Sequence, residues 1–190
     1  MDSLSNIILT GKTSTENALH IYDQLEPVDS SFMIGRWKGS EFRTGHRMDG
    51  LLEVCGWYGK LFVDNDTVHP LLFYTASKKE VYAVNPALIP LWFNFPKIRV
   101  LRTILTLAKP ILQTKKPKAR LRMMDHRGKS SATMIYNSKS INDHFRKIDE
   151  NKVMGLMDLK GEPKPYFFIL ERDESPMKIQ LFIATKNQRR

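Results

Sequence analysis

A chain of 190 residues, with 42% hydrophobic and 26% charged residues, has the length and composition of one globular domain with a sizeable core. Its single cysteine, Cys55, excludes an internal disulfide framework, and nothing in it resembles a secretory leader or a membrane span, so we expect a cytoplasmic protein. The net charge of +10 equals the balance of residues 97–129, which hold eleven basic residues and one acidic residue, so we expect one basic surface.

The first predicted element is a helix in the run STENALHIYDQLEP, residues 14–27. Ser14 or Thr13 can cap its N-terminus, and apolar residues recur at helical spacing between Ala18 and Leu25. Pro27 then ends the helix.

The next element is a strand in GRWKGSEF, residues 35–42, whose alternate residues differ in character. Gly35, Trp37 and Gly39 share one face, because successive side chains of a strand point to opposite sides. One large ring between two glycines is typical of a curved strand that closes the end of a barrel. We therefore predict that Trp37 is a buried plug and that the glycines let the sheet bend.

A proline-rich stretch, residues 85–117, separates two groups of strands. Short strands and turns are expected before it, up to a strand in residues 79–85. We predict a short amphipathic helix between Pro96 and Pro110, which would form an inserted lid. Its apolar face consists of Ile98, Leu101, Ile104, Leu105 and Ala108.

The last third of the chain is predicted to be an antiparallel meander, with residues 141–149 as a helical turn or loop within it. Strands are expected in residues 119–125, 130–137, 152–159, 166–173 and 177–184. We therefore expect a single domain, residues 1–190. Its parts are an N-terminal half (14–84), the proline-rich helical insertion (85–117) and the C-terminal meander (118–184).

Two runs of the sequence carry a resemblance to a known family. Residues 35–62, from GRWKG to WYGKLF, and residues 68–73, VHPLLF, resemble the family named for its G-x-W-x-G motif. Residues 127–172 resemble the domain of unknown function that usually follows it. A G-x-W on a first strand also resembles calycin-type barrels, namely lipocalins, fatty-acid-binding proteins and nitrobindins. The chain departs from nitrobindins after Gly39, and its final strand has no histidine that could ligate haem.

This resemblance implies a mainly β fold, a calycin-like antiparallel β-barrel with an N-terminal helix and an inserted helical lid. Such barrels can enclose one small ligand. The resemblance names no ligand, reaction or cofactor.

Three polar residues in turn-rich stretches are the candidate catalytic residues: His46, Asp49 and His69. A histidine beside a carboxylate can act as a general acid or base near neutral pH. Together with Glu53, the same residues could ligate a metal ion, although their spacing matches no metal motif. The simpler alternative is that they bond to turn backbone and cap a strand end.

The candidate ligand-binding residues are aromatic or basic. Arg120 and Arg122 could point inward and hold an anionic group, or face water while Leu121 and Met123 point inward, which is the simpler alternative. Cys55 carries no nucleophile signature, and a small apolar role suits it better. The aromatic candidates for lining an apolar pocket are Trp57, Tyr58, Trp92 and Phe95.

These observations favour a protein that binds a small, mostly apolar or amphiphilic molecule inside a barrel. One alternative is a small-molecule enzyme that uses the His and Asp residues as acid and base. Another is binding of an anionic surface by residues 97–129, either a membrane or, less favoured, nucleic acid, because the run KKPKARLR has no aromatic residue for stacking on bases.

Overall fold

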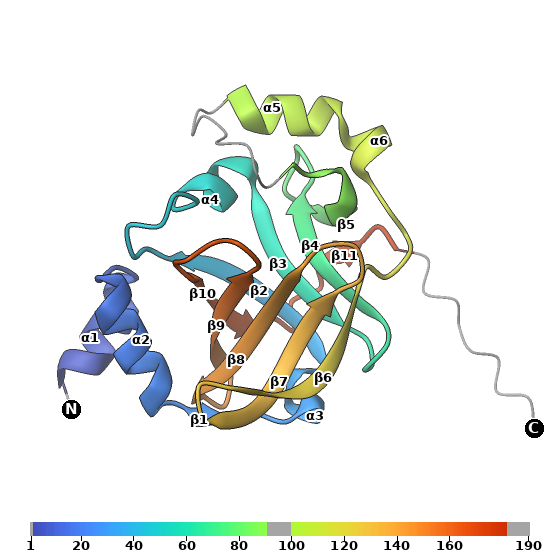
Figure 1. The fold of residues 1–190 in the computed structure, drawn as a ribbon. Coiled ribbons are helices and arrows are strands. Elements are labelled where there is room, and N and C mark those ends of the chain that lie inside the picture. The colour runs from blue at the N-terminus through green and yellow to red at the C-terminus, as the bar shows by residue number, and fades with distance from the viewer. Residues whose placement is uncertain (1, 91–99, 182–190) are drawn as a thin grey trace, which may run out of the picture.

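The structure, a computed structural model, describes residues 2–90 and 100–181. Within them, eight antiparallel strands close into a barrel in the order β4-β3-β2-β10-β9-β8-β7-β6, and β6 pairs back to β4 through Ala119 and Val68 (Figure 1). The barrel strands are β2 (Gly35–Phe42), β3 (Trp57–Phe62), β4 (Val68–Tyr74), β6 (Ala119–His126), β7 (Lys129–Tyr136), β8 (Ile141–Asp149), β9 (Lys152–Leu159) and β10 (Tyr166–Arg172). The predicted fold class is therefore confirmed.

Strand β4 forks at the mouth of the barrel. Its first residue pairs with β6, whereas its last three residues pair with the separate strand β5 (Glu80–Ala83). Strand β11 (Lys178–Ile179) extends β5 in parallel, and β1 (Glu26–Pro27) pairs with β8. The fork leaves β5 and β6 apart, so the barrel wall near the mouth must be completed by the segment between them.

Most helices lie outside the barrel in two groups, and α3 (Ser30–Met33) lies apart from both at the opposite end from α5 (Val100–Leu107) (Figure 1). Helices α1 (Asp2–Thr10) and α2 (Thr15–Gln24) lie on one side, where α2 buries Ala18, Ile21 and Tyr22 in a cluster with the outer faces of β2, β9 and β10. The short helix α3 precedes β2. The helices at the mouth are α4 (Leu51–Cys55), η1 (Pro86–Leu88), α5 and α6 (Lys109–Leu112).

The G-x-W-x-G strand places Trp37 in the barrel core. Trp37 is 0% exposed, its indole N–H donates to the Met33 carbonyl at 2.8 Å, and the Arg172 guanidinium lies 4.3 Å from the ring centroid. The structure gives Gly39 a role other than the predicted bending. A Cβ on Gly39 would lie 2.1 Å from the ring of Trp57, so the glycine makes room for a second tryptophan on the neighbouring strand.

Several elements differ from the predictions. Residues 141–149 are strand β8, not a turn or loop: Ile141, Asp143 and Phe145 are buried while the barrel partners β7 and β9 hold the backbone extended. Helices α1, α3 and α4 were not predicted. The structure describes the predicted strand over 177–184 only as far as residue 181. Within that part, Lys178–Ile179 form β11. No helix in the described ranges is long and apolar enough to cross a membrane.

We predict that Trp37→Ala lowers the free energy of unfolding by about 3–5 kcal/mol, because it empties a fully buried site in the core. Urea denaturation measures this loss. Lys38→Ala, a change at the exposed neighbouring position, is the matched control and should alter stability by no more than about 0.5 kcal/mol. Equal losses in the two variants would contradict a structural role for the ring.

Candidate functional site

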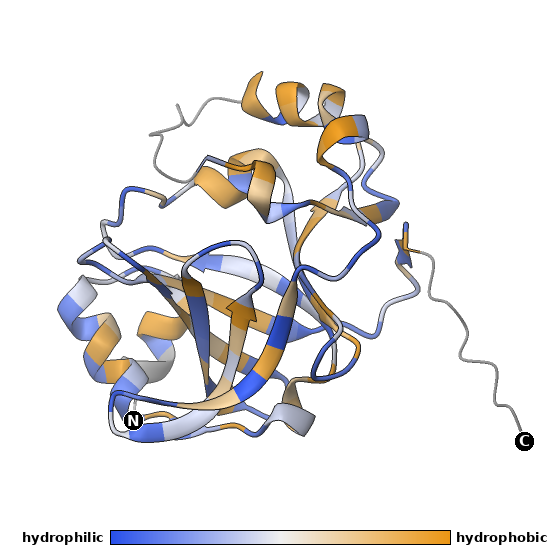
Figure 2. Ribbon diagram, turned by 45° about the vertical axis from the view of Figure 1, so that its right-hand side comes forward, coloured by the Kyte–Doolittle hydropathy of each residue, from blue (hydrophilic) through white to orange (hydrophobic). Residues whose placement is uncertain are grey.

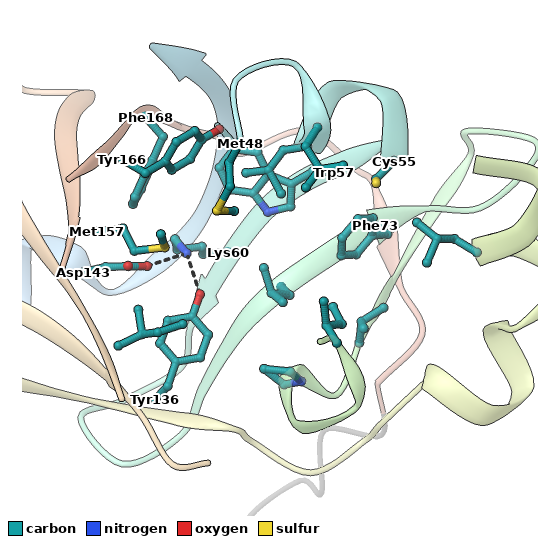
Figure 3. A pocket seen from close by; sticks show the side chains of 18 of the residues that line it. Met48, Cys55, Trp57, Lys60, Phe73, Tyr136, Asp143, Met157, Tyr166 and Phe168 are labelled. Atoms are coloured by element: carbon teal, nitrogen blue, oxygen red, sulfur yellow. Dashed lines mark hydrogen bonds and ion pairs between the residues drawn. The ribbon is translucent and has the colours of Figure 1, made fainter. Parts of the chain in front are cut away.

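A cavity lies at the mouth end of the barrel, beneath the helical cover (Figure 3). The space open to water-sized molecules inside it is about 120 Å³. Most of its wall is apolar, and the barrel strands and the covering segment both contribute. The apolar wall consists of Met48, Leu51, Leu52, Cys55, Trp57, Leu71, Phe73, Tyr82, Val84, Pro86, Ile89, Leu101, Leu105, Leu112, Ile141, Met157, Tyr166 and Phe168.

The proline-rich insertion supplies the part of the wall that the fork in β4 leaves open. Val84 makes an isolated bridge with Gln113, which brings the two ends of this segment together. Leu101 and Leu105 of α5 and Leu112 of α6 then reach the cavity, as does Pro86 of η1. The insertion therefore covers the mouth, in the position expected of a lid.

A buried ion pair interrupts the apolar wall. The ammonium Nζ of Lys60 lies 2.8 Å from the Asp143 carboxylate Oδ2, and the two side chains are only 3% and 1% exposed. The same ammonium donates to the Pro70 carbonyl at 3.2 Å and lies 3.5 Å from the Tyr136 hydroxyl. These groups from β3, β4, β7 and β8 form one polar cluster, which we call the lysine cluster: Lys60, Asp143 and Tyr136.

Aromatic rings surround the ammonium of the lysine cluster. The Lys60 Nζ lies 4.9 Å from the ring centroid of Phe168 and 5.7 Å from that of Trp57. A cation is attracted to such ring faces, most strongly where water is excluded. The indole N–H of Trp57 is buried without a hydrogen-bond partner in the described structure, and Figure 3 shows its nitrogen directed toward the interior of the site. The cavity thus offers a free donor, the Trp57 N–H, near a held cation.

The electrostatics of the lysine cluster follow from its burial. Burial raises the pKa of the Asp143 carboxyl, although the adjacent Lys60 ammonium opposes the shift. Burial also raises the pKa of the Tyr136 hydroxyl well above its ordinary value, so this group stays protonated. The second Asp143 oxygen, Oδ1, has no partner among the described residues. The cluster therefore holds one proton-accepting carboxylate whose charged form is disfavoured by its surroundings.

His46 and Asp49 belong to one turn and serve its backbone. The Asp49 carboxylate accepts the backbone N–H groups of Thr44, Gly45 and His46 at 2.8–3.0 Å, and His46 Nδ1 accepts the N–H of Met48 at 3.1 Å. Burial lowers the pKa of His46, while the Glu162 carboxylate opposes this. Both residues therefore bond to the backbone of the turn, which is the simpler of the two interpretations of the sequence.

His69 lies apart from this turn, on β4 opposite Leu61. It is buried, and burial lowers the pKa of its imidazole to about 4, so the ring is neutral at pH 7. None of the hydrogen bonds, ion pairs or ring contacts in the described ranges joins it to His46 or Asp49. The three candidate catalytic residues are not brought together, and none of them lines the cavity.

The predicted ligand-binding residues are placed in different surroundings. Trp57 lines the cavity, whereas Tyr58 points outward into a cluster with Leu72 and Val81. Trp92 and Phe95 lie outside the described residues. Burial raises the pKa of the Cys55 thiol to about 12, so this cavity residue remains a neutral thiol.

Arg120 and Arg122 lie on the outer face of β6, as in the simpler alternative, and do not point into the barrel. Ala119 and Leu121 are buried in the core, and alternation along the strand sends the arginines outward. Arg122 is bound there to Asp66 at 2.5 Å. Met123 is also exposed, so only part of the expected inward face is buried.

Sequence reasoning missed all three residues of the lysine cluster. Tyr136 and Asp143 follow the inward alternation of β7 and β8, beside Met134 and Phe145. A charged residue at an inward position is the signal that could have found Asp143, but residues 141–149 were not recognised as a strand. Lys60 was hidden by a register shift in β3 at Gly59.

No group of three or more His, Cys, Asp or Glu side chains in residues 2–90 and 100–181 is placed to hold a metal ion. The polar groups among the described residues of the cavity wall are the lysine cluster, the Trp57 indole N–H, the Tyr166 hydroxyl and Arg47. The cavity can therefore bind a small apolar molecule and form hydrogen bonds to one polar group of that molecule.

The fold and site define a closed antiparallel barrel with an internal, largely apolar cavity. Residues 20–78 match the family described as "GXWXG protein", and residues 117–172 match the family described as "Domain of unknown function (DUF4334)". A solved structure, described as the crystal structure of a protein from Thermomonospora curvata, is 33% identical, with a TM-score of 0.68. The similarity covers 90% of this chain and 95% of that chain. The chain belongs to the family that joins these two domains, as the resemblance implied.

No curated protein matches the chain at a significant level. The function must therefore be argued from the cavity and from the surfaces around it.

We predict that Lys60→Met and Asp143→Leu each lower the free energy of unfolding by about 3–5 kcal/mol, because each leaves an unpaired buried charge. The double variant Lys60→Met/Asp143→Leu should recover most of this loss, since apolar groups of similar size can replace a buried pair at little cost. Urea denaturation of the four proteins gives the comparison. A double variant less stable than both single variants would show that the pair is required for folding.

Proposed function

We propose that this protein binds a small, mostly apolar molecule in the barrel cavity. The observation that carries the proposal is the cavity itself, which combines a nearly continuous apolar wall with a single polar cluster. Ligand pockets commonly have this composition, in which apolar groups provide affinity and a few polar groups fix orientation.

The size of the cavity limits the ligand. An engineered apolar cavity of about 150 Å³ in another protein binds benzene. The space of about 120 Å³ in this barrel is of the same order, so it suits a compact molecule of roughly one ring or a short branched chain. A ligand with one polar substituent would place that substituent toward Lys60 and its partners, because the remaining wall offers few hydrogen-bonding groups.

The alternative of acid and base chemistry by His46, Asp49 and His69 has less support. Two of these residues are engaged in a turn, the third lies on another strand, and the cavity wall includes none of them. Ligand binding is therefore the function that the geometry favours.

We predict that small aromatic compounds such as toluene raise the melting temperature of the protein by binding in the cavity. A ligand at 100 times its dissociation constant stabilises the native state by about 2.7 kcal/mol. Leu105→Trp, which fills the cavity from α5, should abolish the shift. The control Ile104→Trp adds the same ring at the neighbouring exposed position and should leave the shift intact. A shift that Leu105→Trp leaves unchanged would place the binding elsewhere.

We also propose that the helical cover contacts anionic membrane surfaces. Four apolar side chains of α5 and α6 are exposed by 52–76%, and they lie within the segment that carries the net charge of the chain. These residues are Val100, Ile104, Leu107 and Ile111. Figure 2 shows the apolar character of both helices at the mouth. An apolar face with nearby basic residues is typical of segments that lie at a lipid surface.

For this second function we predict binding to vesicles that contain anionic lipid, weak binding to neutral vesicles, and release at high salt. Each basic residue near such a surface contributes about 1 kcal/mol, and salt screens the attraction. Charge reversal at Lys115, Lys116 and Lys118 should weaken binding, as should Leu107→Gln. The control is Leu9→Gln, a similarly exposed leucine on the distant helix α1. Tighter binding to RNA than to anionic vesicles in the same buffer would favour the nucleic-acid alternative.

A further inference from the structure

The lysine cluster contains the parts needed for reversible covalent bonding to a carbonyl compound. A lysine amine becomes a nucleophile toward carbonyl carbon when it gives a proton to a neighbouring acceptor. Here the Lys60 ammonium is 3% exposed and already in contact with a proton acceptor, Asp143 Oδ2, at 2.8 Å. The amine also belongs to the wall of the cavity, where a small ligand would lie.

We propose that Lys60 forms an imine with a small apolar aldehyde or ketone bound in the cavity, with Asp143 as the group that accepts and returns the proton. This inference rests on the proposed ligand binding and names the chemical class of the ligand.

The reaction balances within the lysine cluster and the ligand. The Lys60 ammonium gives one proton to the Asp143 carboxylate, and the nitrogen lone pair forms a bond to the carbonyl carbon. The C=O π electrons move to oxygen, which takes a second proton from the same nitrogen. Asp143 then returns its proton to that oxygen, the C–O bond breaks, and water leaves as the nitrogen lone pair forms the C=N bond. An ammonium and a carbonyl thus become a protonated imine and one water.

The surroundings of Lys60 suit each stage of this reaction. Burial raises the pKa of the Asp143 carboxyl, so this group is suited to accept a proton and return it. The product keeps one N–H and one positive charge, which Asp143 can balance at the position that it already occupies. The faces of Phe168 and Trp57 lie 4.9 and 5.7 Å from that nitrogen and stabilise a cation.

The Trp57 indole N–H could donate a hydrogen bond to the carbonyl oxygen of the ligand. The Trp57 indole N–H is buried without a partner, and its ring is held against β2 because Gly39 has no side chain. A carbonyl oxygen near this N–H would satisfy a buried donor, which otherwise costs free energy. The small, apolar cavity further favours carbonyl compounds over sugars or charged oxo acids.

The test is reductive trapping of the wild-type protein with benzaldehyde and sodium cyanoborohydride, followed by intact mass and peptide mapping. Cyanoborohydride reduces an imine to a stable secondary amine, so the modified lysine is fixed in place. We expect the benzyl adduct to form at Lys60 before the exposed lysines react. Prior incubation with toluene should slow the reaction at Lys60 alone, because both molecules occupy the same cavity.

Two variants test the roles of the two residues, while toluene binding is measured on the wild-type protein. Lys60→Met/Asp143→Leu removes the amine and should lose the early adduct. Asp143→Asn keeps the amine, and we expect adduct formation at Lys60 to slow at least about 100-fold, since a positioned acid or base contributes about 10²–10⁴-fold. The control Lys38→Met removes an exposed lysine from the adjoining strand and should leave adduct formation at Lys60 unchanged.

The outcomes are distinct. Toluene binding with labelling only at exposed lysines would overturn imine formation and leave ligand binding in place. The absence of any toluene effect on the wild-type protein would overturn ligand binding itself. An adduct at Lys60 that Asp143→Asn does not slow would reject the role of Asp143.

Discussion

The close approach of β2 and β3 is the constraint on which the cavity depends. A Cβ on Gly59 would lie 2.0 Å from the Trp37 carbonyl oxygen, so only glycine allows the two backbones to come this near. At the same glycine, where φ is +146°, the pairing of β3 with β4 shifts register. The shift turns Trp57 and Lys60 to the same side, although they are three residues apart. Without it, strict alternation would send one of them outside the barrel.

The buried pair of Lys60 and Asp143 is hard to explain as a device for stability. Desolvation of two charges costs several kcal/mol per ion, and apolar residues of similar volume commonly serve as well. The pair lies in the wall of the cavity, at the one place where the apolar lining is interrupted. By contrast, the polar side chains of His46 and Asp49 satisfy backbone groups of a turn and have a structural explanation.

The helical cover relates the cavity to the outside of the molecule. Helix α5 sends Leu101 and Leu105 toward the cavity, while Val100, Ile104 and Leu107 point away from it and stay exposed. One short helix thus carries two apolar faces, and only the first has a partner in the described structure. In our proposals these two faces have related functions, because a ligand that partitions into lipid could pass from the membrane surface to the cavity beneath the same helix.

The resemblance of two sequence runs to a known family implied the barrel class. The sequence patterns by themselves determined the helix at residues 15–24, most strands of the C-terminal meander and the burial of Trp37. These features follow from local patterns, namely helical spacing with a cap at Ser14, alternation along strands, and one large ring between glycines. The prediction of a covering helical insertion also came from local signals, the prolines and the amphipathic run between them.

Only the tertiary structure decided which polar side chains line the cavity. Lys60 and Asp143 lie far apart in the chain, on strands that are not neighbours in the sheet, and they meet across the interior because the barrel closes. Their contact depends on a register shift at one glycine and on barrel curvature, which arise from packing between strands and leave no periodic signal in the sequence.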